Sequence, residues 1–301
     1  MKKVLVTGGA GFIGSNLVDR LIDLGIEVTV IDNEYSDAHE SFYWNLKASN
    51  HKIDIREYER IRPLFDGVDT VFHLAAEARI QPAIENPIEA VSINVLGTCN
   101  ILQAARDAGV ERVLYSSTSS AYGLKNTPPL REDMASDCLN PYSVSKVSGE
   151  ELCKMYTNLF GLKTVVFRYF NVYGERQPTK GQYAPVVGLF LKQKKDGKPM
   201  TIVGDGNQTR DYTYVGDVVE ANIKAAKVNI GFGEIYNIGC GIEHSVLDLA
   251  NMIGGEKTFI PSRIGESRYT KADITKAKNT LGWEPKMKIE NWIEAALADT
   301  K

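Results

Sequence analysis

The sequence predicts an α/β protein in which a doubly wound parallel sheet is joined to a smaller mixed α/β lobe. Through the first half of the 301 residues, short apolar runs alternate with stretches of helical spacing. This alternation is the pattern of successive β-α-β units in a parallel sheet. The first apolar run also ends in a cluster of glycines, which breaks the strand before the first helix.

The first half supplies most of the expected sheet. The expected strands are 3–7, 27–31, a short one at 49–55, 69–74, 112–116 and 163–167. The helices expected between them are 15–24, 57–65, 85–108 and 141–160. Parallel strands joined in this way require right-handed crossovers.

In the second half, strand and helix patterns alternate less regularly, and many Gly and Pro residues surround one expected helix at 184–196. Further helices are expected at 215–226, 244–253 and 273–281, with strands at 235–238 and 258–260. We expect residues 1–170, with about 212–238, to form the sheet domain. Residues 171–211 and 239–301 would then form a lobe over the carboxyl ends of the strands, where such sheets bind ligands.

Composition excludes several classes of function. The formal net charge is −3 and no long run of like charges occurs, so neither nucleic acid nor an anionic membrane is an expected partner. No apolar segment approaches the ~18 residues of a membrane span, and the chain starts directly with a strand, so we expect a cytoplasmic protein. The four cysteines lack C-x-x-C pairing and the four histidines lack metal-ligand spacing, so we expect free thiols and no metal.

The glycine cluster after the first strand predicts a dinucleotide site. Gly8, Gly11 and Gly14 follow T-G-x-x-G-x-x-G spacing, and Gly9, Gly11 and Gly14 follow G-x-G-x-x-G spacing. Such a turn needs backbone angles closed to other residues, and a diphosphate must approach the helix N-terminus without a Cβ in the way. We therefore predict a Rossmann-type fold, with an ordinary glycine-rich turn as the alternative. The expected cofactor contacts here are Gly8, Gly11, Phe12, Ile13 and Gly14.

The end of the second strand indicates which dinucleotide binds. Asp32 lies eighteen residues after Gly14, close to the ~20 expected for a carboxylate on the adenosine ribose. An acid there binds a free 2′-hydroxyl and repels a 2′-phosphate, so we predict NAD rather than NADP. A capping or surface aspartate is the alternative. The adenosine contacts expected with Asp32 are Asn33, Asp54 and Ile55.

Tyr142 and Lys146 are the strongest candidates for catalysis. They lie four residues apart in a helix expected to start at Pro141, so they share one face. A tyrosine acting as acid or base needs its pKa, normally ~10, to be lowered, and a lysine ammonium beside it has that effect. The strand ending at Ser116 is followed by four hydroxyl residues, including Thr118, which could bind a substrate hydroxyl. Together these features predict hydride transfer at an alcohol carbon, with a surface helix pair as the alternative.

Further blocks extend the pattern over nearly the whole chain. They are His73-Leu74-Ala75-Ala76, Asn94-Val95-x-Gly97-Thr98, Tyr115-Ser116-Ser117-Thr118, Arg168-Tyr169-Phe170-Asn171-Val172-Tyr173-Gly174, Arg210-Asp211-Tyr212 and Leu281-Gly282-Trp283-x-Pro285. With these blocks the sequence resembles the extended short-chain dehydrogenase/reductase family, and within it the nucleotide-sugar epimerases.

The resemblance assigns roles to particular residues. It implies that Thr118 is the hydroxyl partner of Tyr142 and that Asn94 steadies the lysine or nicotinamide region. It adds cofactor contacts at Leu74, Ala75, Ala76, Ser116 and Tyr169, besides Tyr142 and Lys146.

The resemblance also implies a nucleotide-sugar site. Asn171 would contact the sugar diphosphate, and Arg210 and Arg263 would supply its positive charge, since guanidinium groups bind phosphate oxygens in bidentate fashion. Simpler alternatives are a turn cap for Asn171 and salt bridges for the two arginines, with Asp211 next to Arg210 and within Arg-x-Gly-Glu for Arg263. His73 is expected to be structural rather than catalytic.

The hydroxyl cluster favours one reaction of the family. The resemblance implies a reaction that begins with oxidation of a sugar C4 hydroxyl by NAD. In the 4,6-dehydratase and decarboxylase branches of the family, acidic residues of this cluster then transfer further protons. Ser119 and Ser120 occupy those positions here, and a serine hydroxyl cannot replace a carboxylate in acid-base chemistry at neutral pH. We therefore expect an NAD-dependent 4-epimerase acting on a UDP-sugar through a transient 4-keto intermediate.

The sugar is predicted from the same resemblance. The family position that gates the 2-substituent falls on Thr270, small enough for an N-acetyl group, although the neighbouring Tyr269 could occupy the space. The long stretch from Tyr183-Ala184-x-Val186 to Gly206 also looks like the N-acetylhexosamine subgroup, and Val186 is expected to contact the substrate. We expect activity on UDP-glucose, UDP-galactose and their N-acetyl forms.

Three alternative functions remain open, and the resemblance also implies an oligomeric state. A UDP-uronate 4-epimerase needs a further cation for the sugar carboxylate, an NAD(P)-dependent reductase is disfavoured by Asp32, and a non-enzymatic nucleotide sensor would lose Tyr142 or Lys146. The family commonly pairs through two helices in a four-helix bundle. The resemblance thus implies a homodimer through 85–108 and 141–160.

Overall fold

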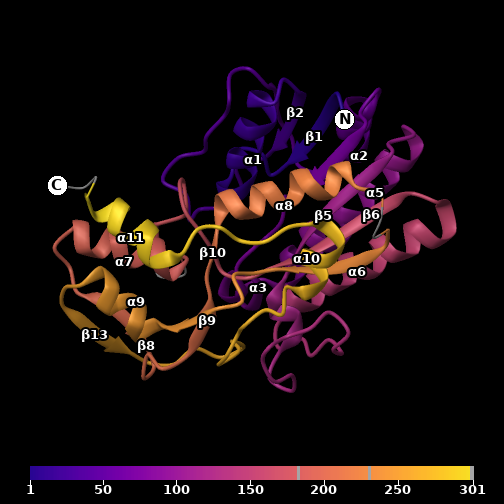
Figure 1. Ribbon diagram of the computed structural model, residues 1–301. Helices are drawn as coiled ribbons and strands as arrows, with labels where there is room; N and C mark the ends of the chain where they lie inside the picture. Colours follow the sequence, from indigo (N-terminus) through magenta and orange to yellow (C-terminus); the bar gives the residue numbers. More distant parts are fainter. Residues whose placement is uncertain (182–183, 230–231, 299–301) are drawn as a thin grey trace.

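A seven-stranded parallel sheet forms the body of the protein, with a smaller lobe beside it, in a computed structural model that describes residues 1–181, 184–229 and 232–298 (Figure 1). In spatial order its strands are β11 (Glu234–Ile238), β6 (Lys163–Tyr169), β5 (Arg112–Thr118), β4 (Thr70–His73), β1 (Lys3–Thr7), β2 (Glu27–Asp32) and β3 (Ser49–Lys52). The predicted doubly wound α/β fold is therefore confirmed. The chain starts in the middle of the sheet and winds outwards in both directions.

Helices cover both faces of this sheet. One face carries α1 (Phe12–Asp23), α8 (Val215–Lys227) and α10 (Thr275–Leu281). The other carries α2 (Tyr58–Ile61), η1 (Arg62–Phe65), α3 (Ile80–Glu85), α4 (Pro87–Val91), η2 (Ser92–Gly97), α5 (Thr98–Asp107) and α6 (Pro141–Phe160). A short 3₁₀ turn, η3 (Ser119–Tyr122), follows β5. In Figure 1, α8 lies among elements from the first half of the chain, although in sequence it follows a segment that belongs to the smaller lobe.

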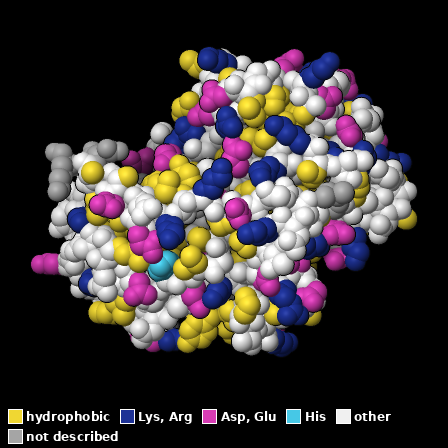
Figure 2. All heavy atoms as spheres, viewed as in Figure 1, with side chains coloured by type: hydrophobic (Ala, Val, Ile, Leu, Met, Phe, Trp, Pro, Cys, Tyr) yellow, Lys and Arg dark blue, Asp and Glu magenta, His cyan; other side chains and the backbone are white. Residues whose placement is uncertain are grey.

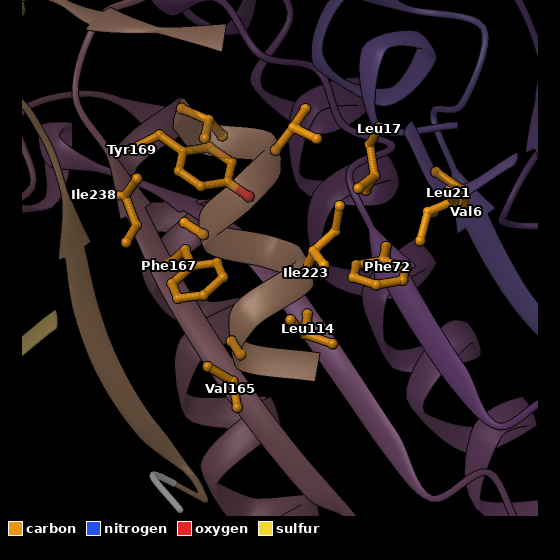
Figure 3. Packing of buried hydrophobic residues seen from close by; sticks show 14 of the residues in the cluster. Val6, Leu17, Leu21, Phe72, Leu114, Val165, Phe167, Tyr169, Ile223 and Ile238 are labelled. Atoms are coloured by element: carbon orange, nitrogen blue, oxygen red, sulfur yellow. The ribbon is translucent and has the colours of Figure 1, made fainter. Parts of the chain in front are cut away.

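The alternation of side chains along each strand divides the core into two layers. In β1, Val4 and Val6 belong to the cluster under α1 and α8, whereas Leu5 belongs to the cluster under α5 and α6. Figure 3 shows the first cluster, in which Phe167 and Ile223 pack between the sheet and α8. Because both faces of the sheet are buried around its inner strands, those strands read as apolar runs, whereas the edge strand β3 is polar and mostly exposed. That is why the inner strands could be predicted.

The lobe has its own small core. Its strands are β7 (Val172–Tyr173), β8 (Met200–Val203), β9 (Thr209–Asp211), β10 (Thr213–Tyr214), β12 (Glu243–Ser245) and β13 (Lys257–Ile260). Its helices are α7 (Val186–Lys195), α9 (Val246–Ile253) and α11 (Ile289–Ala298). Phe190, Ile202, Leu249 and Ile293 meet in its interior. The lobe pairs strands far apart in sequence, such as β8 with β13 and β9 with β12.

The structure differs from the sequence expectations at several boundaries. The helix expected over 85–108 is interrupted by the π-helical segment η2, and the strand expected to reach residue 55 ends at Lys52. The segment expected as a helix from residue 244 begins with the end of strand β12, because His244 pairs with Arg210 of β9. Helices α3 and α11 and most lobe strands were not predicted. Each depends on long-range packing that local sequence does not reveal.

The surface mixes both signs of charge. On the face shown in Figure 2, Lys and Arg side chains are interspersed with Asp and Glu, and hydrophobic atoms are scattered between them. Over the residues described, none of the helices is both long enough and apolar enough to cross a membrane.

Candidate functional site

The glycine turn after β1 is shaped by close packing. Gly8 has φ +69°, and a Cβ on Gly14 would lie 2.1 Å from the carbonyl oxygen of Gly8. A Cβ on Gly11 would meet nothing closer than 3.4 Å, so the protein itself leaves space there. Gly11 is the N-cap of α1, and no side chain caps this helix terminus. The N-terminus of α1 is thus open to an anion, and the turn fits a dinucleotide diphosphate.

Asp32 lies at the end of β2, beside this turn. The side chain is buried, and its carboxylate accepts the backbone N–H of Ala10 at 3.1 Å and that of Glu34 at 2.8 Å. Burial raises the pKa of Asp32, while these two N–H groups act against that rise. The carboxylate is therefore oriented by the main chain towards the cavity that it lines.

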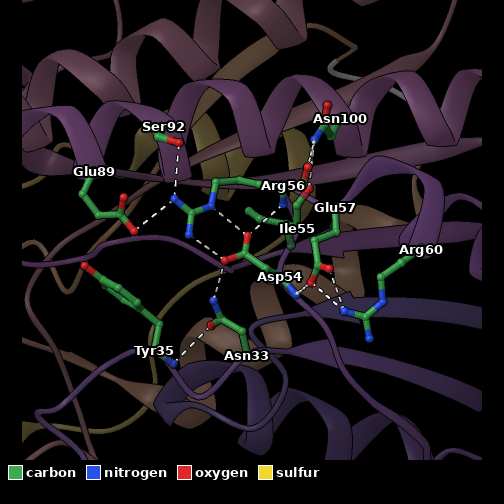
Figure 4. Close-up of polar contacts among 10 residues, drawn as sticks. All are labelled: Asn33, Tyr35, Asp54, Ile55, Arg56, Glu57, Arg60, Glu89, Ser92 and Asn100. Atoms are coloured by element: carbon green, nitrogen blue, oxygen red, sulfur yellow. Dashed lines mark hydrogen bonds and ion pairs between the residues drawn. The ribbon is translucent and has the colours of Figure 1, made fainter.

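Asp54 lines the same cavity and belongs to a polar network (Figure 4). Its carboxylate accepts Arg56 Nη2 at 2.7 Å and Asn33 Nδ2 at 2.9 Å. Burial raises the pKa of Asp54, but the bonds from Arg56 outweigh burial and hold that pKa below its usual value. Arg56 also contacts Glu89 and Ser92, which ties this corner to α4 and η2. Asn33 and Asp54 are thereby held at fixed positions on the cavity wall.

One cavity collects nearly all of the expected cofactor residues. Those that line it are Gly8, Gly11, Phe12, Ile13, Gly14, Asp32, Asn33, Asp54, Ile55, Leu74, Ala75, Ala76, Ser116, Tyr142, Lys146 and Tyr169. Thr118 lines it as well. These residues come from the carboxyl ends of β1, β2, β3, β4, β5 and β6 and from the start of α6, so the structure assembles the predicted site from seven separate segments.

Asn94 lies behind the cavity instead of on its wall. It is fully buried in η2, where its side chain accepts the backbone N–H of Glu77 at 2.9 Å and donates to the Glu77 carbonyl at 3.0 Å. It also donates to Ser145 Oγ at 2.9 Å. Asn94 therefore connects the loop after β4 with α6 through Ser145, the residue next to Lys146.

The start of α6 positions the catalytic candidates. Asn140 and Ser143 form a capping box and Pro141 occupies the first turn, so the helix begins where the sequence predicted. Burial raises the pKa of Tyr142 to about 12, and a hydrogen bond with the Thr118 side chain acts against that rise. The pKa of this phenol is therefore not lowered here as the sequence argument required, because burial outweighs the other influences. The contact between Tyr142 and Thr118 brings together the two residues expected at a substrate hydroxyl.

Lys146 is enclosed in the protein interior. Its Nζ lies 4.4 Å from the centroid of the Tyr115 ring. Burial lowers the pKa of Lys146 to about 7, against the opposing influence of Cys153 and Glu150. His73, behind it, is bonded through Nδ1 to Thr7 and through Nε2 to Thr98. Both ring nitrogens are thus engaged by structural hydroxyls, and burial, with the charge of Lys146, lowers the pKa of His73 to about 3.

A second cavity adjoins the first and carries most of the expected substrate residues. Asn171, Arg210, Arg263 and Thr270 line it. Val186 does not, since its neighbours Pro185 and Val187 line the wall at the start of α7. Tyr183 lies outside the described residues. The shared wall of the two cavities includes Arg79, Ser119, Ser120, Asn171 and Pro185.

Two of the arginines that line the second cavity, Arg210 and Arg263, converge on one carboxylate. Arg210 Nη2 lies 3.6 Å and Arg263 Nη1 lies 3.9 Å from Glu266. Arg210 does not use Asp211 as a partner in the way the salt-bridge alternative supposed. The carboxylate of Asp211 instead accepts backbone N–H groups of Cys240, Gly241 and Ala272. Two guanidinium groups so placed can hold a diphosphate.

Sequence reasoning missed several residues of the site. Arg79 lines both cavities, and the buried Glu77 accepts its Nε at 3.3 Å. Tyr35, His39 and Phe42, from the loop after β2, also line the first cavity. The one available signal was the presence of two charged residues, Glu77 and Arg79, just after the block His73-Leu74-Ala75-Ala76. The loop after β2 has no periodicity that could have indicated its position.

Comparison with known proteins agrees with this geometry. Residues 4–239 match the model of the NAD dependent epimerase/dehydratase family. The UDP-glucose 4-epimerase of Thermotoga maritima, solved with UDP-glucose, is 36% identical with a TM-score of 0.91, and the alignment covers 99% of this chain and 100% of that one. The UDP-N-acetylglucosamine 4-epimerase of Methanobrevibacter ruminantium, in complex with UDP-N-acetylmuramic acid, is 30% identical with a TM-score of 0.91, and the alignment covers 99% of each chain. The UDP-glucuronate 4-epimerase of Thermodesulfobacterium geofontis is 36% identical over 96% of this chain and 93% of its own.

The neutral state of His73 should make the protein acid-sensitive. An unfolded histidine binds a proton below about pH 6.5, whereas folded His73 stays neutral until about pH 3. Stability is therefore retained above pH 6.5 and lost as the pH falls, by up to about 1.4 kcal/mol per pH unit from this residue. Urea unfolding at successive pH values between 7.5 and 4 measures it. In His73→Asn this part of the slope should disappear, and an unchanged slope would contradict the assignment.

Proposed function

This chain belongs to the NAD-dependent epimerase/dehydratase family, and we propose that it inverts C4 of a UDP-hexose or UDP-N-acetylhexosamine through a transient 4-keto sugar. The observation that carries this proposal is the position of Thr118 and Tyr142, in mutual contact beside the wall shared by the two cavities. The sheet domain would hold NAD in the first cavity. The lobe would hold the nucleotide sugar in the second, with its diphosphate between Arg210 and Arg263.

The side chains divide the acid-base work. Tyr142 takes the proton of the C4 hydroxyl and returns it after the ketone has turned over. Thr118 bonds the same hydroxyl and orients it towards the phenol. Lys146, buried one helical turn after Tyr142, supplies positive charge when protonated and so favours the phenolate. When bound, NAD supplies hydride acceptance at C4 and hydride return to the opposite face of the sugar.

The serines beside Thr118 restrict the reaction to epimerisation. Ser119 and Ser120 line both cavities, where a dehydratase or decarboxylase would need carboxylates. Their hydroxyls can hydrogen-bond a sugar but do not exchange protons with its carbon atoms at neutral pH. Epimerisation needs no further acid or base, because the ketone only has to rotate and accept the hydride again.

The charges around the shared wall favour a neutral sugar over a uronate. Arg79 is the arginine common to both cavities, and its Nη1 lies 2.6 Å from Asp37 while its Nε lies 3.3 Å from Glu77. Two carboxylates around one guanidinium leave the cluster with net negative charge. A sugar carboxylate at this place would be repelled.

Thr270 supports acceptance of a 2-acetamido group. It is buried in the second cavity, with its hydroxyl 3.4 Å from Asn171 Nδ2. Tyr269, the neighbour that could have filled the space, is half exposed and its hydroxyl bonds Arg268. The protein would thus use both plain and N-acetylated hexoses.

The assembly that we propose is a homodimer in the cytoplasm. Exposed apolar side chains lie on the mutually packed α4, η2 and α6, at Ile88, Leu96 and Val144. A second copy of the chain would remove them from water. All four cysteines are free thiols, which suits a reducing compartment.

Replacing the phenol should abolish turnover. Tyr142→Phe is expected to retain less than about 1% of the wild-type rate with UDP-galactose, because a general acid-base contributes ~10²–10⁴-fold. Tyr156→Phe is the matched control, since this tyrosine lies on the same helix but bonds Gln103 away from both cavities. Retention of more than about 1% by Tyr142→Phe would refute the role of Tyr142.

Enlarging residue 270 should change the choice of sugar. Thr270→Tyr is expected to lower kcat/KM for UDP-N-acetylgalactosamine relative to UDP-galactose by about tenfold or more, the size of a typical steric effect in a pocket. Thr270→Ser keeps the small volume and should retain the wild-type ratio. Product chromatography with the two substrates and UDP-galacturonate measures the preference. An unchanged ratio in Thr270→Tyr, or a preference for UDP-galacturonate in the wild type, would be inconsistent with this account of the sugar site.

Charge placed on the apolar helix surface should separate the dimer. Light scattering should find the wild type at twice the 33.3 kDa chain mass, and Leu96→Asp with Val144→Asp should give the single mass. Leu124→Asp, at an exposed loop position, is the control and should remain dimeric. A monomeric wild type would dismiss this interface.

A further inference from the structure

Asp211 ties two loops to one strand of the lobe. It ends β9 and is completely buried. Its Oδ1 accepts the backbone N–H of Cys240 at 2.6 Å, and its Oδ2 accepts those of Gly241 at 2.8 Å and Ala272 at 3.0 Å. One carboxylate therefore fixes the loop after β11 and the segment that follows Thr270.

The main chain of Asp211 contacts two of the proposed substrate residues. Its N–H donates to Thr270 Oγ1 at 3.4 Å, and its carbonyl accepts Asn171 Nδ2 at 3.1 Å. Asn171 has φ +23°, a conformation that a residue other than glycine holds only when its surroundings impose it. The bond from Asn171 to Asp211 is part of what imposes it.

The neighbours of Asp211 face the second cavity. Side chains alternate along a strand, so Arg210 and Tyr212 line that cavity while Asp211 points to the opposite side. Asp211 thus adjoins Arg210 in sequence and Asn171 and Thr270 through hydrogen bonds. These three residues lie on different segments, and Asp211 is their common neighbour.

We propose that Asp211 is a positioning residue for the nucleotide sugar, an inference that rests on the proposed function of this cavity. It sets the distances between Arg210, Asn171 and Thr270 without touching the ligand. An ionised carboxylate suits the role because it only accepts hydrogen bonds, and three N–H donors surround it. Burial raises the pKa of Asp211 to about 6, against the three N–H groups, so the group remains ionised at pH 7.

The test compares two buried aspartates. Asp211→Asn keeps the shape but turns one acceptor into a donor that faces backbone N–H groups. We expect KM for UDP-galactose and the Kd for UDP to rise about tenfold, with kcat changed less than about threefold, since uniform binding is lost rather than transition-state stabilisation. The amount of bound NAD should not change.

Asp217→Asn is the matched control. Asp217 is also buried, and its Oδ2 accepts the backbone N–H groups of Lys286 at 2.9 Å and Met287 at 3.0 Å. These bonds hold the segment before α11 and none of the three substrate residues. An equal rise of KM and Kd in Asp217→Asn, or unchanged values in Asp211→Asn, would overturn the positioning role.

Two further measurements keep the inference separable from the proposed function. A wild type that binds UDP but converts no UDP-sugar would contradict the epimerase, while the Kd for UDP in the two variants would still decide the role of Asp211. If Asp211→Asn does not fold, hydrogen exchange in the wild type replaces it. The amides of Cys240, Gly241 and Ala272 should exchange slowly, and exchange as fast as in exposed loops would overturn the inference.

Discussion

The packing of α6 against β5 is the constraint on which the rest of the site depends. Gly149 allows the helix to approach so closely that a Cβ there would lie 2.2 Å from the Tyr115 hydroxyl, and that hydroxyl donates to the carbonyl of Lys146 at 3.2 Å. One residue further on, Glu150 accepts Ser117 of β5 and forms a buried ion pair with Arg168 of β6. These contacts set the rotation and height of α6. They therefore bring Tyr142 to Thr118 at the carboxyl edge of the sheet.

Burial at this edge opposes charge on both catalytic candidates. It raises the pKa of Tyr142 to about 12 and lowers that of Lys146 to about 7. Burial therefore makes the charged form of each side chain costly. In the proposed reaction, the proton of the sugar hydroxyl would be exchanged within this buried site. In the proposed reaction, the serines beside Thr118 would add hydrogen bonds but no further acid, so only return of the hydride could follow oxidation at C4.

Sequence alone predicted those parts of the molecule that local rules determine. Buried parallel strands appear as apolar runs, Gly8 and Gly14 follow from the steric demands of one turn, and Tyr142 with Lys146 follows from helical spacing. Residues placed by long-range contacts were beyond its reach. Arg79 lines both cavities because the loop after β4 is held by Asn94, a buried residue in a π-helical turn that bonds the main chain of Glu77. Val186 was expected on the cavity wall, but the start of α7 directs Pro185 and Val187 there instead.

The central claim is that one hydride leaves C4 and returns to the same carbon, with NAD retained by the protein. The most direct measurement uses UDP-galactose carrying deuterium at C4, incubated with the purified protein without added NAD, followed by mass spectrometry and NMR of the products. The account predicts UDP-glucose with deuterium still at C4 and no exchange of carbon-bound hydrogen with solvent. Loss of the label to water, or incorporation of solvent hydrogen at C4 or C5, would contradict it.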